Sequence, residues 1–204
     1  MEINQARKIL DHLYLGINGY DISAKARQKM VVSDKAFTYG EVVPDQFHQI
    51  LSFVKPKPNE VFYDLGSGLG KPTFLASMLF DFSKATGIEL LADLWQVSEK
   101  VLERFEKDIR PGLDERKKAQ TIDFVNENFL DYDFSDGDII FTHSTCFSFE
   151  TLEKLARKIE RLKQGARIIT ITKTIESPFL QLLGNGEFLM NWGRATAYFY
   201  QKII

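Results

Sequence analysis

The chain has 204 residues, a formal net charge of −2 and a hydrophobic content of 44%, which fits one domain with a sizeable core. The near-neutral charge gives no strong signal for nucleic acid or an anionic membrane, and no run of about 18 apolar residues predicts a membrane span. The single cysteine, Cys146, excludes an internal disulfide and a cysteine-based metal cluster. Because Met1–Leu10 lacks the apolar core of a signal peptide, we expect a cytoplasmic protein. The three histidines, His12, His48 and His143, are too few for a metal site, so we expect no bound metal.

Apolar residues at helical spacing predict two short helices within residues 1–35, and Pro44 is typical of the start of a third helix. From residue 61 onward, short apolar runs alternate with amphipathic segments. The apolar runs predict strands at 61–65, 85–89, 121–126, 138–142 and 167–172, and the amphipathic segments predict helices at 72–80, 91–108 and 149–162. This alternation favours a parallel sheet with helices on both faces.

The C-terminal part departs from the alternation. Two extended runs, 187–191 and 195–203, are separated by Trp192-Gly193-Arg194, which predicts an antiparallel hairpin. We expect a loop at 184–186 just before it, which would help to shape a substrate site. The expected fold is therefore α/β: a doubly wound, mostly parallel seven-stranded sheet that ends in an antiparallel hairpin. By analogy, this is the Rossmann-like topology of class I methyltransferases.

The most informative segment of the chain follows the first predicted strand. Glycines at alternate positions let a backbone approach a ligand closely. The helix that starts near Pro72 directs free N–H groups and the positive end of its dipole toward the same place. The spacing G-x-G-x-G differs from the dinucleotide fingerprint G-x-G-x-x-G. The residues that we expect to contact a nucleoside cofactor here are Asp64, Gly66, Ser67, Gly68, Gly70 and Lys71.

Three further elements fit the same cofactor. Glu89 ends the second strand, where a carboxylate can accept both ribose hydroxyls of a nucleoside. Asn128 and Phe129 follow the third strand and can bond the adenine amine and flank its ring, although ordinary loop polarity is an alternative. Tyr39 and Glu41 precede the first strand and either fold over the cofactor's amino-acid end or belong to a helix-capping loop. Together with the hairpin, these elements favour S-adenosylmethionine over a nicotinamide dinucleotide.

The ordered set of motifs resembles the Dot-one-type lysine methyltransferases, which lack a SET domain. The resemblance covers residues 39–174 and rests on Tyr39-Gly40-Glu41, Asp64–Gly68, Gly87-Ile88-Glu89, Asn128-Phe129-Leu130 and Gly165–Ile168 with Lys173. The Tyr-Gly-Glu loop is the most specific motif, because the glycine turn and the strand-end acid are common to many methyltransferases. The resemblance implies S-adenosylmethionine as cofactor, S-adenosylhomocysteine as product and a lysine amine as methyl acceptor.

One departure from the family concerns the segment after the fourth strand. The family carries an Asn-Asn-Phe motif beside the reactive methyl group, and an ungapped alignment places His143-Ser144-Thr145 there. Because ligands of open α/β sheets lie at the carboxyl ends of the strands, His143 and Ser144 are candidate catalytic residues, and His143 would accept a proton or a hydrogen bond. Alternatively, both side chains only cap the next helix. The aromatic residues that would form an apolar channel, or else belong to the core, are Phe141, Phe147, Phe149 and Trp192.

The expected function is therefore methyl transfer to a protein lysine. The chain lacks the basic tail with which the family binds nucleosomal nucleic acid, so the resemblance implies a protein substrate without implying a nucleosome. A small-molecule or RNA acceptor remains an alternative, although the chain has no Asn/Asp-Pro-Pro-Tyr/Phe motif of base methylases. A non-catalytic module with the same fold is a further alternative. We expect residues 1–38 to form a helical segment of the acceptor site and residues 39–204 to form the S-adenosylmethionine-binding domain.

Overall fold

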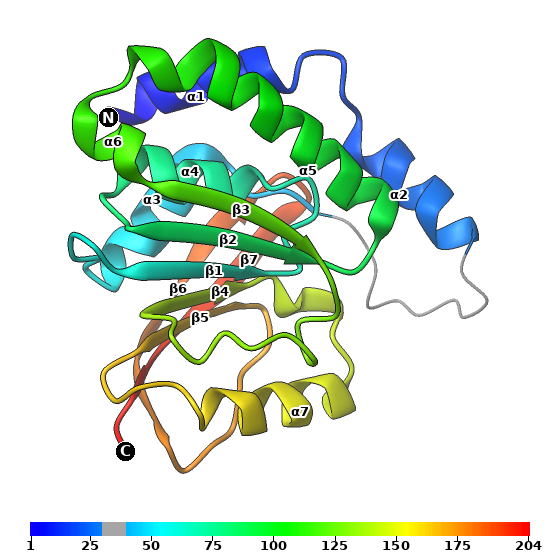
Figure 1. The fold of residues 1–204 in the computed structure, drawn as a ribbon. Helices are drawn as coiled ribbons and strands as arrows, with labels where there is room; N and C mark the ends of the chain where they lie inside the picture. Colours follow the sequence, from blue (N-terminus) through cyan, green and yellow to red (C-terminus); the bar gives the residue numbers. More distant parts are fainter. Residues whose placement is uncertain (30–39) are drawn as a thin grey trace.

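The computed structural model describes residues 1–29 and 40–204, and its centre is a seven-stranded sheet with the order β3-β2-β1-β4-β5-β7-β6 (Figure 1). Strands β1 to β5 pair in parallel, and β7 runs antiparallel to both β5 and β6. This topology confirms the predicted fold class. The strands are β1 (Val61–Leu65), β2 (Lys84–Glu89), β3 (Thr121–Asn126), β4 (Ile139–Thr142), β5 (Arg167–Ile171), β6 (Leu180–Met190) and β7 (Gly193–Lys202).

Helices cover both faces of this sheet, with α7 on one side and α4 and α5 on the other (Figure 1). None of the helices formed by the described residues is long and apolar enough to cross a membrane. The helices are α1 (Ile3–Leu13), α2 (Gly19–Gln28), α3 (Pro44–Phe53), α4 (Lys71–Leu79), α5 (Ala92–Arg104), α6 (Glu115–Ala119) and α7 (Phe149–Ile159). A π-helical turn (Phe105–Ile109) and a 3-10 turn (Arg110–Gly112) follow α5, and a second 3-10 turn (Ser144–Cys146) follows β4.

The central strands are apolar at successive positions because both of their faces are covered. In β4, Ile139 and Phe141 pack on the side of α3 and α4, where the Phe141 ring meets Phe47 edge-on with centroids 5.2 Å apart. Ile140, between them, belongs to the opposite cluster with Leu155 of α7. The sheet is therefore a rigid layer whose carboxyl-terminal edge can present side chains in fixed positions.

The glycine turn after β1 passes into α4 at Gly70, which has a φ of 84°, a conformation that residues with a Cβ rarely adopt. A Cβ on Gly70 would lie 2.4 Å from the ring of Phe124 in β3, and a Cβ on Gly87 would lie 2.7 Å from the same ring. Pro72 occupies the first turn of α4, where its missing N–H costs nothing. The glycines therefore bring the start of α4 close to the ends of β1 and β2.

Helices α1 and α2 lie over α4 and α5 (Figure 1). Arg104 of α5 donates a hydrogen bond to the backbone oxygen of Leu13 at 3.3 Å, and Lys29, just after α2, forms an ion pair with Asp93 of α5 at 2.8 Å. This packing brings Tyr14, at the end of α1, over the start of α4, where its hydroxyl donates to the backbone oxygen of Leu69 at 2.7 Å.

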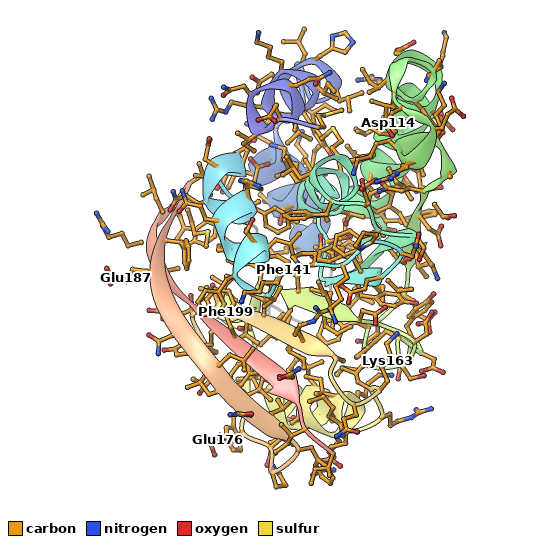
Figure 2. The ribbon with its side chains drawn as sticks, turned by 90° about the vertical axis from the view of Figure 1, so that its left-hand side faces the viewer. Asp114, Phe141, Lys163, Glu176, Glu187 and Phe199 are labelled. Atoms are coloured by element: carbon orange, nitrogen blue, oxygen red, sulfur yellow. The ribbon has the colours of Figure 1, made fainter. Side chains whose placement is uncertain are left out.

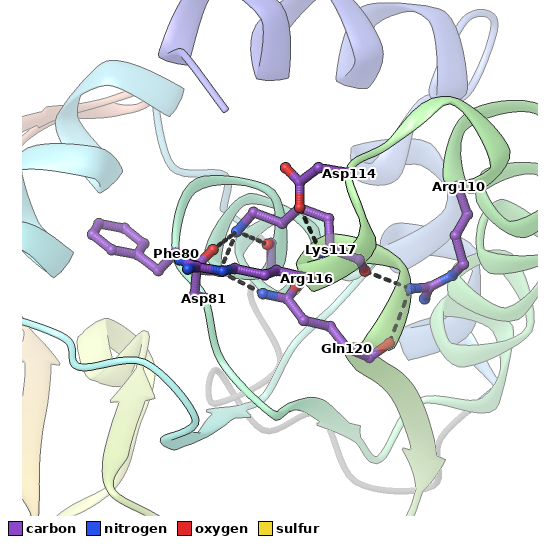
Figure 3. A network of polar contacts seen from close by, with 8 residues as sticks. Phe80, Asp81, Arg110, Asp114, Arg116, Lys117 and Gln120 are labelled. Carbon is purple, nitrogen blue, oxygen red and sulfur yellow. Dashed lines mark hydrogen bonds and ion pairs between the residues drawn. The ribbon is translucent and has the colours of Figure 1, made fainter.

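Helix α6, which the sequence analysis did not predict, anchors the carboxyl-terminal end of α4 (Figure 3). The buried Lys117 Nζ donates to the backbone oxygens of Ser77, at 2.9 Å, and Phe80, and it pairs with Asp81 at 3.0 Å. Gln120 Nε2 donates to the same Phe80 oxygen at 2.7 Å. Burial lowers the pKa of Lys117, and Asp81 opposes that shift. These contacts fix the end of α4 that lies away from the glycine turn.

The C-terminal hairpin is longer than the sequence predicted. Strands β6 and β7 pair along most of their length, with a bulge between Leu182 and Gly184. The predicted loop at 184–186 is wrong: Gly184 and Gly186 lie inside β6, because pairing with β7 supplies an extended partner for both. Figure 2 shows Phe199 of β7 in the interior and Glu187 on the outer side of the hairpin. The edge strand β6 therefore continues the sheet instead of shaping a substrate site through a loop.

Candidate active site

A cavity lies at the carboxyl ends of β1, β2 and β4, beside the start of α4. In an open α/β sheet this is the place where ligands bind. The structure brings most of the predicted site residues together here. The predicted residues that line the cavity are Glu41, Asp64, Gly66, Ser67, Gly68, Lys71, Glu89, Asn128, Phe129 and His143.

Two of the predicted residues that the structure describes do not line this wall, and a third, Tyr39, lies outside the described residues. Gly70 forms the turn beneath the cavity and packs on Phe124. Ser144 is buried, and its Oγ donates to the backbone oxygen of Ile171 at 2.7 Å. Its hydroxyl is thus used to hold the segment after β4 against the end of β5.

Glu89 is buried and is held by the backbone on two sides. Its Oε2 accepts a hydrogen bond from the Gly68 N–H at 2.8 Å, and its Oε1 accepts one from the Leu91 N–H at 2.8 Å. Burial raises the pKa of Glu89, and these hydrogen bonds to the carboxylate counteract the shift. Each carboxylate oxygen has two lone pairs, so both can still accept a hydroxyl from a ligand.

Asp64, at the end of β1, is buried next to the same turn. Its Oδ2 accepts a hydrogen bond from Thr73 Oγ1 at 3.0 Å. The pKa of Asp64 is raised to about 7, mainly by burial; the Thr73 hydrogen bond opposes this rise and the nearby Glu89 adds to it. The cavity thus has two acids whose charges are costly without a ligand that donates hydrogen bonds to them.

The glycine turn leaves room and one polar group free. A Cβ on Gly66, where φ is 81°, would meet nothing within 4 Å. The Oγ of Ser67 is buried and has no hydrogen-bond partner among the described residues. Buried polar atoms are usually paired. An open cradle with an unpaired hydroxyl therefore fits a polar ligand at this turn.

Lys71 and Glu41 form an ion pair at the rim of the cavity, with Nζ and Oε2 2.7 Å apart. Their side chains are 22% and 18% exposed, so the pair is partly shielded from water. The Lys71 ammonium also lies 5.0 Å from the centre of the Tyr14 ring, within the range of a cation–π contact. This rim carries one positive and one negative group, which suits a zwitterionic ligand.

Asn128 and Phe129 line the side of the cavity near β3. Asn128 Oδ1 accepts a hydrogen bond from the Leu130 N–H at 3.0 Å, which fixes the direction of the amide. The Phe129 ring stacks on Phe147, with centroids 5.3 Å apart and an interplanar angle of 25°. Both rings line the cavity, and they give it an apolar wall on this side.

His143 lies directly after β4 and lines the cavity. Its Nε2 is buried and has no hydrogen-bond partner among the described residues, and its Nδ1 lies 3.4 Å from Thr145 Oγ1. The ring meets Trp192 edge-on, with centroids 4.5 Å apart. Burial lowers the pKa of His143 to about 4. The imidazole is therefore neutral at pH 7 and can accept a hydrogen bond.

Several residues of the wall were not predicted. Four of them are apolar and lie at the start of α5 and in the loop before α3, and one is a threonine in the first turn of α7: Val42, Leu90, Leu91, Leu94 and Thr151. Two adjacent leucines directly after the acid that ends a strand are the signal that could have identified part of this set. Phe141 and Phe147 line the cavity as expected, whereas Phe149 is 76% exposed.

The fold is that of S-adenosylmethionine-dependent methyltransferases. TrmN from Thermus thermophilus matches with a TM-score of 0.62 and 14% identity over 89% of this chain and 52% of its own. An RNA methyltransferase from Salinibacter ruber, solved in complex with S-adenosyl-L-homocysteine, matches with a TM-score of 0.58 and 18% identity over 77% of this chain and 90% of its own. At such identities the likeness concerns the fold alone.

The sequence pattern of the family described as histone methylation protein DOT1 matches residues 20–182, and this chain belongs to that family. An H3 lysine-79 specific histone-lysine N-methyltransferase from Dictyostelium discoideum is 30% identical over 151 residues, which make up 70% of this chain and 8% of the relative. A protein of the same description from Caenorhabditis elegans is 29% identical over 65% of this chain and 14% of its own length. The chain thus spans a small part of these relatives.

Family membership confirms the resemblance drawn from the motifs, and with it S-adenosylmethionine as the methyl donor. It also supports the predicted class of enzyme, a protein-lysine methyltransferase. One expectation is wrong: the relatives are named for a histone, which is a chromatin protein, and this contradicts the predicted cytoplasmic location.

Proposed function

We propose that this chain transfers a methyl group from S-adenosylmethionine to a lysine amine of a protein substrate. The observation that carries the proposal is the arrangement of one cavity. Its glycine turn is held by the buried Glu89, and its other side presents the unpaired Nε2 of the neutral His143. A donor site and an acceptor site thus share one enclosed space.

The residues of the donor side fit the cofactor piece by piece. Glu89 would accept hydrogen bonds from the ribose hydroxyls. The open space at Gly66, with the unpaired Ser67 hydroxyl, would hold the part of the ligand between the ribose and the amino-acid end. Asn128 and Phe129 would hold the adenine. Glu41 and Lys71, one negative and one positive, would bind the ammonium and carboxylate of the amino-acid end. When bound, the cofactor supplies an electrophilic methyl group on a sulfonium.

The acceptor side favours a neutral amine. A lysine amine has a pKa of about 10.4 in water, and an apolar surrounding lowers it. Phe129, Phe141 and Phe147 supply such a surrounding. His143 would accept a hydrogen bond from the amine N–H and so direct the nitrogen lone pair along the line of displacement, which is one part of the alignment that lowers the barrier. Because its pKa is about 4, His143 would orient the neutral amine and leave the amine protons on the nitrogen, so that the product is a methylammonium ion.

Ser144 and the N-terminal helices have supporting parts in this proposal. Ser144 would keep His143 in place through its bond to the Ile171 backbone. Helix α1 ends at the rim of the cavity, where Tyr14 contacts Lys71, and we assign residues 1–38 to the approach of the acceptor. The relatives are named for histone H3, which makes this histone the first protein acceptor to test.

The test is the transfer of isotope-labelled methyl to histone H3, to nucleosomes and to a protein extract, followed by mass spectrometry of the modified residues. We expect the label on the ε-nitrogen of lysine. Protease treatment should release this label from the macromolecular fraction, and nuclease treatment should not. A His143→Leu variant should bind S-adenosylhomocysteine normally and transfer little label. Label in nuclease-sensitive or small-molecule material, or no transfer to any acceptor, would contradict the proposal.

A further inference from the structure

The turn between β6 and β7, residues 190–193, lies against the segment 40–42 that carries Glu41. Met190 and Val42 form an isolated antiparallel bridge. The Trp192 ring covers Gly40 so closely that a Cβ there would lie 2.7 Å from it. The C-terminal hairpin, which lies about 150 residues further along the chain, therefore holds this segment in position at the cavity.

One residue of this turn, Asn191, pairs with both backbone polar groups of Glu41. Its side-chain Oδ1 accepts a hydrogen bond from the Glu41 N–H at 3.1 Å, and its own N–H donates to the Glu41 oxygen at 3.3 Å. Asn191 also lies near Tyr20 of α2 and lowers the pKa of Tyr20, against a larger rise from burial. Asn191 thus lies where the hairpin, α2 and the segment at Glu41 meet.

Asn191 itself is exposed and lies outside the cavity wall. Glu41 is held from two directions: Asn191 fixes its backbone, and Lys71 fixes its carboxylate at 2.7 Å. Without the Asn191 side chain, the Glu41 N–H would lose its acceptor while the carbonyl bond to the turn remained. A small displacement of a binding group weakens its contacts with the part of the ligand that it touches and leaves the contacts with the rest of the ligand unchanged.

We propose that Asn191 is a positioning residue for the amino-acid end of the cofactor, which acts by setting the Glu41 carboxylate opposite Lys71. This inference rests on the assignment of Glu41 and Lys71 to that end in the proposed function. It adds a residue of the β6–β7 turn to the determinants of cofactor affinity.

Two ligands separate this role from a general structural one. S-adenosylhomocysteine has the amino-acid end, and 5′-methylthioadenosine has the nucleoside and the sulfur without it. For Asn191→Ala, calorimetric titration should show a Kd for S-adenosylhomocysteine that is about five- to tenfold higher, as expected for one lost hydrogen bond. The Kd for 5′-methylthioadenosine should change less than twofold. Asn191→Asp retains the acceptor for the Glu41 N–H and should restore most of the affinity.

The matched control is Asn185→Ala, because Asn185 is an exposed asparagine of the same hairpin. It should bind both ligands like the unchanged protein. Equal weakening of both ligands by Asn191→Ala, no weakening of either, or the same effect from Asn185→Ala would overturn the inference. If the unchanged protein bound neither ligand, the cofactor assignment would fail instead. Failure to methylate lysine would leave these binding results unaffected.

Discussion

The two sides of the cavity differ in how their polar groups are paired. On the donor side, Glu89 and Asp64 already receive hydrogen bonds from Gly68, Leu91 and Thr73. On the acceptor side, His143 keeps a buried nitrogen unpaired among aromatic rings. The carboxylates of the proposed donor side are therefore held in place by the turn itself, where, of the described side chains, only the Ser67 hydroxyl is left unpaired for a ligand, whereas the proposed acceptor side would pair its His143 nitrogen only with a ligand present. The following changes test each half of that comparison.

The largest expected effect comes from Glu89→Gln. The amide would place an NH2 group against the N–H of Gly68 or Leu91, where the carboxylate accepts hydrogen bonds. Hydrogen bonds to charged groups contribute about 1.5–3 kcal/mol, so the Kd for S-adenosylhomocysteine should rise about 100-fold in calorimetry. Glu103→Gln, which removes an exposed charge on α5, should leave the Kd unchanged. A loss of less than about threefold in Glu89→Gln would refute the preorganised donor side.

His143→Leu tests the acceptor side. Removing the acceptor for the amine should slow methyl transfer about 10- to 100-fold, which corresponds to about 1.4–2.7 kcal/mol in the barrier, while the Kd for S-adenosylhomocysteine stays within twofold. Single-turnover kinetics and calorimetry on the same samples give both numbers. His143→Asn, which restores the residue type of the family motif, should retain most of the rate. Parallel losses of rate and affinity would place His143 on the donor side instead.

Lys71→Met should have a smaller effect on the donor side. The variant removes the Lys71 ammonium from the Glu41 carboxylate at a rim where the two side chains are only 22% and 18% exposed. We expect the Kd for S-adenosylhomocysteine to rise about tenfold, with the increase reduced at high salt concentration because ions screen the interaction. Lys100→Met, on the exposed side of α5, is the control. Equal affinities in the two variants would exclude Lys71 as a ligand contact.

A separate expected effect concerns the stability of the chain without ligand and not its affinity. The pKa of Asp64 is raised in the folded chain from 3.8 to about 7, so between these values the folded state holds a proton that the unfolded state has lost. The free energy of unfolding without ligand should therefore fall as the pH rises through this window, by at most about 1.4 kcal/mol per pH unit from this group. Urea denaturation at a series of pH values should show a flatter profile for Asp64→Asn. Parallel profiles would show that Asp64 is not buried as described.

The residues of the proposed donor side could be predicted to lie together because their determinants are local in sequence. The glycine turn, Glu89 and the Asn128-Phe129 pair each follow directly from the end of a strand, and the topology of parallel strands brings those ends to one edge. Ser144 was assigned to the wall from its place beside His143, although its hydroxyl is used by the Ile171 backbone. The direction of the Ser144 side chain depends on the position of the end of β5, which the spacing of residues in the sequence does not predict.

The contacts of the β6–β7 turn could not be predicted for a related reason. Asn191 and Glu41 are 150 residues apart, and neither carries a motif that points to the other. The extended β6 was missed because Gly184 and Gly186 are typical of loops, whereas pairing with β7 keeps them in the strand. Long-range pairing decided both features.

A crystal structure with S-adenosylhomocysteine tests the division of the cavity most directly. It should show the ribose hydroxyls on Glu89, the amino-acid end between Glu41 and Lys71, and the sulfur facing the space in front of His143 Nε2. A cofactor whose ribose lies away from Glu89, or whose adenine covers His143, would contradict the account.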